Sequence, residues 1–139
     1  MNGIVIYFSL LGNNEQLAQT LAQQKSYEIR EFSPGSLLRV FQYFLGKKKL
    51  RQKAKILNEE IEQYEKVIIC GPIWGGTLAP ALEILLKKLD LKTKKLRLYL
   101  TFTESYEGLE KSLDEINKSN HLNIQEIEYI KITNENKTY

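Results

Sequence analysis

Two short runs of consecutive apolar residues constrain the fold of this chain more than any other feature. They occupy residues 4–8 and 67–70, and each precedes a glycine-containing loop. A strand that is apolar at every position is typical of a parallel sheet that is covered on both faces. After each loop, apolar residues recur at helical spacing: Leu17, Ala18, Leu21 and Ala22 in the first case, and Ala81, Leu82, Leu85 and Leu86 in the second. The sequence therefore predicts an α/β domain built from strand–loop–helix units.

Three further strands complete the predicted sheet. Residues 26–32 and 123–133 alternate apolar and charged side chains, as half-exposed edge strands do, and Leu96, Leu98, Leu100 and Phe102 mark another core strand. Placing the alternating strands at the edges gives a five-stranded parallel sheet of order 2-1-3-4-5, with helices on both faces. This three-layer sandwich places the loops after the first and third strands side by side, at the switch point where such sheets bind ligands.

The remaining segments carry weaker signals. We predict a short helix over 36–46, capped by Ser36, then a charged connector with some helix as far as residue 64. Residues 71–76 are expected to form a loop, with Thr77 as the N-cap of the next helix and Pro80 in its first turn. Leu109, Leu113 and Ile116 mark a further amphipathic helix, and residues 134–139 are expected to fray.

Length and composition fit a single domain over residues 1–139. The lone cysteine, Cys70, excludes an internal disulfide and fits a reducing compartment. The N-terminus lacks the pattern of a signal peptide, and no apolar stretch approaches the ~20 residues that span a bilayer. We therefore expect a cytoplasmic protein without a membrane span.

The net charge of +3 is concentrated in two basic groups. The first comprises Lys47, Lys48, Lys49, Arg51, Lys53 and Lys55, and the second comprises Lys87, Lys88, Lys92, Lys94, Lys95 and Arg97. Either group can simply be a solvated face. Neither has the interleaved aromatic residues that nucleic-acid binding usually requires, so we expect no nucleic-acid partner. An acidic protein partner is the better functional interpretation.

The loop after the first strand can hold an anion. The N-terminus of the following helix offers free backbone N–H groups and the positive end of the helix dipole. No Lys or Arg precedes Lys25, so the anion would rely on amides, on Ser9 and on the Asn side chains. The alternative is an ordinary turn in which the Asn residues only cap the helix.

Two segments together resemble the short flavodoxins. Residues 4–13, which end in Ser9-Leu10-Leu11-Gly12-Asn13, are similar to the phosphate loop of that family. The run Gly71-Pro72-Ile73-Trp74-Gly75-Gly76-Thr77, with Pro80 downstream, is similar to its second flavin loop. The resemblance implies a flavodoxin-like fold, non-covalent binding of FMN and electron transfer.

The same resemblance implies which residues form the cofactor site. The FMN phosphate would lie among Ser9, Leu10, Leu11, Gly12, Asn13 and Asn14. The isoalloxazine ring would lie against Pro72, Ile73 and Trp74, with Gly75 and Gly76 close to its edge. Thr103, Glu104, Ser105 and Tyr106 would form a third wall, in which Tyr106 could be a second stacking partner. No catalytic or metal-ligating residue is expected.

Several positions depart from the family pattern. Leu11 and Asn14 stand where hydroxyl residues are usual, Glu104 and Glu107 make the third loop acidic, and the chain is basic whereas typical flavodoxins are acidic. Three functions therefore stay open. The chain could be an electron carrier that docks an acidic redox partner, as a monomer or weak dimer; a small FMN-dependent quinone-type oxidoreductase; or a binding module that has weakened or lost FMN binding. An electron carrier is favoured over an enzyme with its own substrate.

Overall fold

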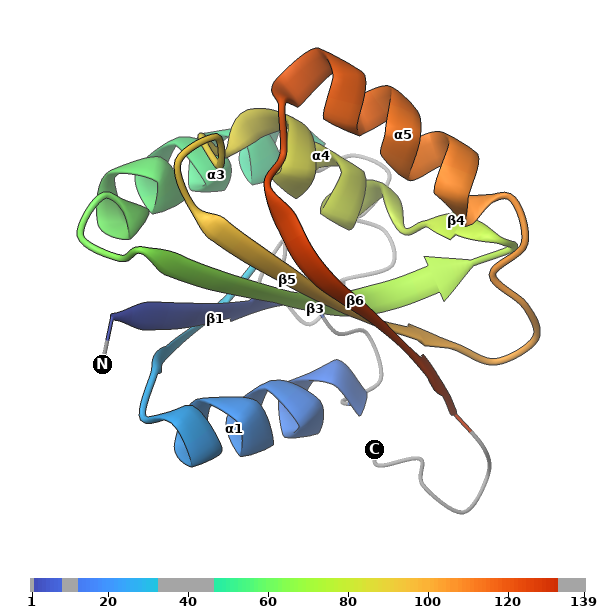
Figure 1. The fold of residues 1–139 in the computed structure, drawn as a ribbon, viewed down its shortest axis with the longest axis horizontal. Helices are drawn as coiled ribbons and strands as arrows, with labels where there is room; N and C mark the ends of the chain where they lie inside the picture. Colours follow the sequence, from blue (N-terminus) through green and yellow to red (C-terminus); the bar gives the residue numbers. More distant parts are fainter. Residues whose placement is uncertain (1, 9–12, 33–46, 133–139) are drawn as a thin grey trace.

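A mostly parallel sheet forms the centre of the molecule (Figure 1). The computed structural model describes residues 2–8, 13–32 and 47–132. The strand order is β2-β1-β3-β5-β6, with the short β4 paired antiparallel to β3. The strands are β1 (Gly3–Tyr7), β2 (Glu28–Glu31), β3 (Lys66–Trp74), β4 (Thr77–Leu78), β5 (Lys95–Phe102) and β6 (Ile124–Lys131).

This topology confirms the predicted order of the five parallel strands, with β2 and β6 at the edges. The first strand is buried along its whole length, whereas β2 and β6 are partly exposed. The continuous apolar run therefore correctly predicted a central strand. The alternation of apolar and charged residues correctly predicted the two edge strands of the sheet. The antiparallel β4 was not predicted, because two residues are too few to show a period.

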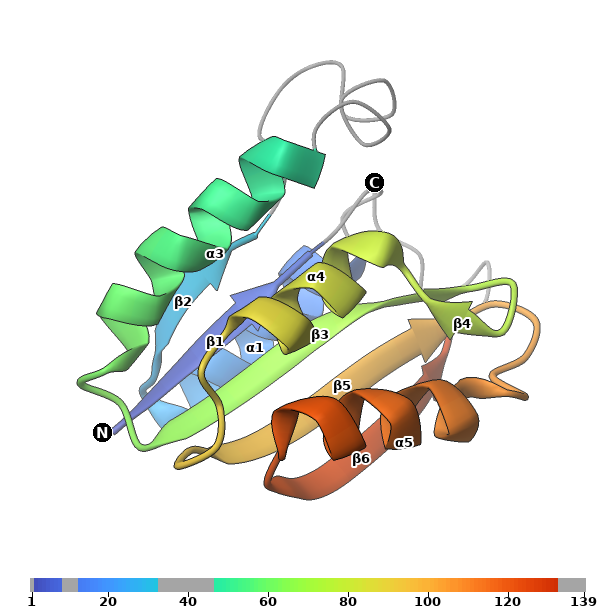
Figure 2. The same ribbon diagram turned by 90° about the horizontal axis from the view of Figure 1, so that it is seen from above.

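Four described helices cover the two faces of the sheet unequally. They are α1 (Asn13–Lys25), α3 (Lys47–Ile61), α4 (Pro80–Lys88) and α5 (Leu109–Asn120). Figure 1 shows α1 on one face, and Figure 2 shows α3, α4 and α5 across the other. The larger apolar core lies beneath these three helices, and a smaller one lies between α1 and the opposite face. No described helix is long and apolar enough to cross a membrane.

The basic segment forms one helix, not the partly helical connector that was predicted. Leu50, Ala54, Leu57 and Ile61 recur at helical spacing and are all buried, so α3 packs this stripe on the sheet. The dense positive charge obscured the apolar period in the sequence. The predicted helix over 36–46 and the predicted fraying of 134–139 fall outside the described residues.

Two other local predictions were wrong. The second apolar run continues as strand through Trp74, so residues 71–74 belong to β3 and not to a loop. Thr77 lies in β4 and does not cap a helix; Ala79 is the N-cap of α4, with Pro80 following it. Gly71 and Pro72 suggested a break in the strand, but both residues pair with β5. The Pro72 carbonyl accepts a hydrogen bond from the Ala79 N–H at 3.2 Å.

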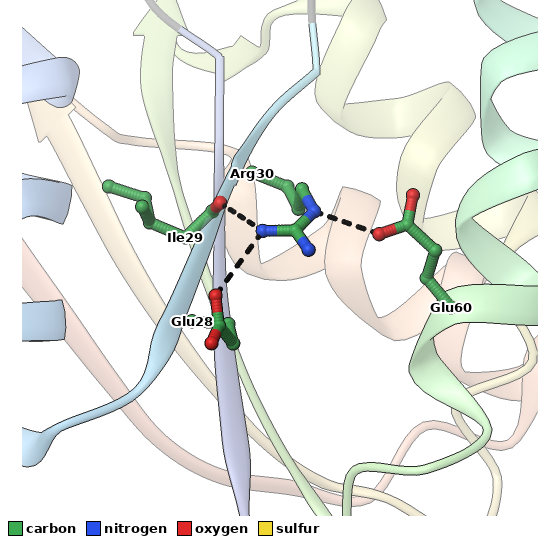
Figure 3. Close-up of polar contacts among 4 residues, drawn as sticks. All are labelled: Glu28, Ile29, Arg30 and Glu60. Carbon is green, nitrogen blue, oxygen red and sulfur yellow. Dashed lines mark hydrogen bonds and ion pairs between the residues drawn. The ribbon is translucent and has the colours of Figure 1, made fainter.

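An ion pair ties the edge strand β2 to α3 (Figure 3). The Arg30 Nε lies 2.8 Å from Glu60 Oε2, and another guanidinium nitrogen lies 3.5 Å from Glu28 Oε2. That same nitrogen donates to the Ile29 carbonyl at 2.8 Å. The hydrogen bond to Glu60 is the main cause of the raised pKa of Arg30. Because these side chains are partly exposed, the ion pair adds little to stability. Its main effect is to orient β2 relative to α3.

Candidate functional site

A groove lies at the carboxyl end of the sheet, between the β3–β4 turn and the loop that follows β5 (the right-hand end in Figure 1). Its volume is about 470 Å³. It is lined by Ile73, Trp74, Gly75, Gly76, Thr103, Glu104 and Ser105. The structure therefore brings together the two segments that the sequence analysis assigned to the ring of the cofactor. Pro72 precedes this lining in β3 and does not itself line the groove.

The β3–β4 turn is built by two glycines in the left-handed region. Gly75 has φ 60° and Gly76 has φ 81°, which side chains with a Cβ adopt at a cost. Thr77 supports the turn, since its hydroxyl donates to the Trp74 carbonyl at 3.1 Å. The turn exposes its main chain to the groove without a side chain at either glycine.

The two walls of the groove touch through their main chains. A Cβ added at Gly76 would lie 2.8 Å from the Glu107 carbonyl oxygen, and one added at Gly108 would lie 3.9 Å from the Gly76 carbonyl oxygen. Gly108 also has a positive φ, 87°. The absence of a Cβ at Gly76 therefore allows the close approach of the two walls, whereas glycine at position 108 is favoured by its backbone conformation.

Trp74 lines the groove and also packs against Phe8, the residue that follows β1. Its ring packs edge-to-face on Phe8, with the ring centroids 5.9 Å apart and an interplanar angle of 67°. Phe8 is fully buried, and its N–H donates to the Cys70 carbonyl at 3.0 Å. The indole is thus held from one side by the core while it lines the groove on the other. Ile73 is almost fully buried, so it contributes mainly the floor.

The first predicted loop is described only at its end. Ser9, Leu10, Leu11 and Gly12 fall outside the described residues, whereas Asn13 and Asn14 form the first turn of α1. The leading N–H groups of a helix have no acceptor within the helix, so this turn offers donors to an anion.

Asn14 has a second role that the sequence did not reveal. It is 3% exposed, and its Nδ2 donates to Thr101 Oγ1 at 2.9 Å. Thr101 is equally buried, and its hydroxyl reaches the Gly71 carbonyl at 3.5 Å. That carbonyl can only accept, so the Thr101 hydroxyl donates to it while its oxygen accepts from Asn14 Nδ2. This contact joins the start of α1 to β5, two residues before Thr103.

The side-chain oxygen of Asn14 is buried. Among the residues that the structure describes, Asn14 Oδ1 has no hydrogen-bond partner. Buried acceptors are normally paired, so this atom is suited to a donor from outside the protein, such as a ligand hydroxyl or a water. It is unsuited to phosphate, because a phosphate oxygen would meet another acceptor. The side chain of Asn14 therefore presents an acceptor, and its assignment to the cofactor site stays a prediction.

Tyr106 has an aromatic partner within the protein. Its ring stacks on Tyr129 of β6, with centroids 4.1 Å apart and an interplanar angle of 10°, and it meets Phe102 edge-on at 4.9 Å. Tyr106 does not line the groove, although Ser105 does. Burial, followed by the Glu110 carboxylate and Tyr106, raises the pKa of Tyr129. The stack anchors the third wall to the edge strand. No sequence pattern indicated this contact, because 23 positions separate the two tyrosines.

The lining of the groove carries little charge. Among the described residues that line it, only Glu104 is charged, and it is exposed. Burial raises the pKa of the nearby Cys70 thiol to about 12, so Cys70 is a packed apolar residue and not a nucleophile. No cluster of potential metal ligands occurs in the described part of the chain. The arrangement suits a flat, largely uncharged ring in the groove and an anionic group at the start of α1.

Comparison with known proteins supports the architecture. No family model and no curated protein matches the chain. Solved structures do match, among them a candidate flavoprotein from Bacteroides eggerthii DSM 20697, which is 19% identical, with a TM-score of 0.68 over 99% of this chain and 89% of that one.

Two further neighbours have similar lengths. A flavoprotein from Lactobacillus acidophilus NCFM, crystallised in complex with FMN, is 16% identical, with a TM-score of 0.63 over 92% of each chain. A flavodoxin from the domain Archaea is 15% identical, with a TM-score of 0.57 over 98% of this chain and 88% of that one. The strand order, the helical layers and these neighbours together show that the chain has a flavodoxin-like fold.

Proposed function

We propose that this chain binds FMN non-covalently at the carboxyl end of its sheet and functions as an electron carrier. The observation that carries the proposal is the groove between the β3–β4 turn and the loop after β5, with Trp74 in its wall. Supporting it, one structural neighbour is a flavoprotein in complex with FMN and another is a flavodoxin. FMN, when bound, supplies reversible one-electron or two-electron chemistry.

The residues present fit the three parts of that cofactor. Trp74 offers a broad aromatic surface for stacking a ring. The first turn of α1 offers N–H donors to a phosphate. The unpaired Asn14 Oδ1 would accept a hydrogen bond from a hydroxyl of the ribityl chain that links them. Each group thus matches the polarity of the part of the ligand that it would meet.

The same residues would influence how the bound ring exchanges electrons. The main chain at Gly75 and Gly76 is open toward the groove and can offer a hydrogen bond to one redox state. The Glu104 carboxylate disfavours added negative charge nearby, which would lower the affinity for a reduced anionic ring. The indole of Trp74 excludes water from the face that it covers.

Reconstitution tests this function directly. Adding FMN to the purified apoprotein should quench flavin fluorescence and shift the visible absorption bands. Because stacking on an aromatic ring contributes about 0.5–1.5 kcal/mol beyond burial, Trp74→Ala should weaken binding by up to about tenfold. Tyr64→Ala removes an aromatic side chain packed on the core away from the groove, and should leave the affinity unchanged.

Unchanged free-flavin emission at high concentrations of folded protein would contradict FMN binding and favour the binding-module alternative. Steady turnover of a nicotinamide donor with a quinone, without a separate reductase, would instead favour the oxidoreductase.

We further propose that the redox partner is an acidic protein. Exposed cations of α3 and α4 face a shared groove of about 270 Å³, lined by Arg51, Pro80, Glu83, Ile84, Lys87 and Lys88. Lys87 is paired with Glu83 at 2.7 Å, whereas Arg51 and Lys88 add positive charge. Such a surface would steer an acidic partner toward the molecule.

Ionic strength tests the partner. Electron transfer with an acidic reductase should slow as salt is added, because exposed charges are screened beyond about 10 Å at 0.1 M salt. The double substitution Arg51→Glu and Lys88→Glu should slow it at low salt, and the charge-matched pair Lys111→Glu and Lys118→Glu on α5 should not. A rate that is independent of salt would contradict the proposal.

A further inference from the structure

A basic pocket lies at the end of the sheet opposite the groove. It is about 100 Å³ in volume and sits where β3 and β5 begin and α1 ends, at the left-hand end of the sheet in Figure 1. Its lining residues are Lys25, Tyr27, Lys66, Val67, Ile68, Lys95, Arg97 and Gln125. Four of these described residues are cations and none of the eight is a carboxylate. The proposed cofactor site uses none of them.

Strand register forces three of these cations onto one face of the sheet. Lys66 and Lys95 are direct partners in the parallel pairing of β3 with β5, and Arg97 lies two positions further along β5. Direct partners point to the same face, and like charges placed opposite each other destabilise a sheet. Lys25 approaches from the last turn of α1, on that face.

The neighbouring carboxylates neutralise only part of this charge. Glu65 lies 3.3 Å from Lys95, and Glu126 is the register partner of Arg97 on β6. Glu126 and Glu128 also act on Tyr99, whose pKa is raised first by burial and then by these carboxylates. No ion pair in the described part of the chain joins Lys25 or Lys66 to a carboxylate. The negative end of the α1 dipole stabilises the positive charge of Lys25. It does not explain why a second cation, Lys66, lies beside it.

The walls give the pocket a defined shape. The ring of Tyr27 covers Gly3, where an added Cβ would lie 2.4 Å from that ring. Gly3 is the register partner of Lys66 on β1, so the aromatic ring closes the pocket beside the lysines. The pocket is about 100 Å³ in volume, which leaves room for a small tetrahedral oxyanion.

We propose that this pocket binds a phosphate group, either as the free ion or as the end of a phosphate monoester. Lysine ammonium groups and an arginine guanidinium are the side chains that form charge-assisted hydrogen bonds with phosphate. A dianion between Lys66 and Lys95 would also offset the repulsion between them. The site is separate from the FMN phosphate, which would lie at the other end of the sheet.

A titration followed by heteronuclear NMR tests the site. Inorganic phosphate, added at constant ionic strength with chloride as the balancing ion, should shift the backbone amides of residues 66, 95 and 97 in a saturable manner. Glycerol phosphate added in the same way distinguishes the two sources: binding of both assigns the phosphate group as the ligand, and binding of phosphate alone assigns the free ion. The titration should give the same result with and without FMN.

Charge-matched variants establish which residues bind. Removing two of the four cations, in Lys66→Gln with Lys95→Gln, should weaken phosphate binding by about tenfold or more. The control, Lys111→Gln with Lys118→Gln, loses the same charge on α5 and should bind as the parent does. Non-saturable shifts, equal affinity in both double variants, or shifts confined to the first turn of α1 would each overturn the proposal.

Discussion

Replacing Gly76 with alanine is expected to destabilise the protein by about 2–4 kcal/mol, because two separate penalties coincide at this residue. The first is conformational, since a φ of 81° lies in a region that L-residues with a Cβ adopt at a cost of about 1–2 kcal/mol. The second is steric, since the new Cβ would lie 2.8 Å from the Glu107 carbonyl oxygen. Relief would require the β3–β4 turn and the loop after β5 to separate, which would widen the groove.

Gly75 provides a matched control for this prediction. It also has a positive φ, 60°, but a Cβ there would meet no described residue within 4 Å. Gly75→Ala should therefore incur only the conformational cost, about 1–2 kcal/mol. Urea denaturation of both variants, with and without FMN, measures the difference. Equal losses of stability in the two variants would show that the contact with Glu107 does not constrain the groove.

The fold could be predicted well from the sequence because the residue pattern of each strand indicates which of its faces are buried. The apolar run in β1 requires cover on both faces, and the alternation in β2 and β6 requires one exposed face, so the strand order followed. The limits of β3 were harder to predict, because Gly71 and Pro72 usually interrupt strands. Position 71 of this strand is suited to glycine because a Cβ there would lie 2.4 Å from the Leu82 side chain of α4. That constraint depends on a helix that passes above the strand, which no local pattern can show.

The candidate site was predicted only in part, for a related reason. Composition and resemblance identified the two walls of the groove, and the structure brings Trp74 and Ser105 together there. The contacts that hold these walls come from distant positions: Tyr129 stacks on Tyr106, and Thr101 pairs with Asn14, 87 positions away. Tyr129 and Thr101 are each a single aromatic or polar residue within a strand. The role of such a residue cannot be predicted from the sequence until its spatial neighbour is known.

Replacing Thr101 with valine, which has nearly the same shape, is expected to destabilise the apoprotein by about 1–3 kcal/mol. The change removes the acceptor 2.9 Å from Asn14 Nδ2, and Asn14 Oδ1 already lacks a partner. The whole amide would then be buried without a hydrogen bond to any residue that the structure describes. Leucine at position 14 has the same branching without polar atoms, so Asn14→Leu should cost less than Thr101→Val, because Thr101 keeps the Gly71 carbonyl as its acceptor.

The double variant, Asn14→Leu with Thr101→Val, should be more stable than Thr101→Val alone, because both members of the pair become apolar together. Thermal and urea unfolding of the four proteins gives the coupling energy. FMN titration of the same set then separates the two roles of Asn14. If Oδ1 accepts a hydrogen bond from the ligand, Asn14→Leu should weaken FMN binding by about tenfold while the apoprotein stays folded. An unchanged affinity would mean that the buried oxygen is satisfied by water and that Asn14 only joins α1 to β5.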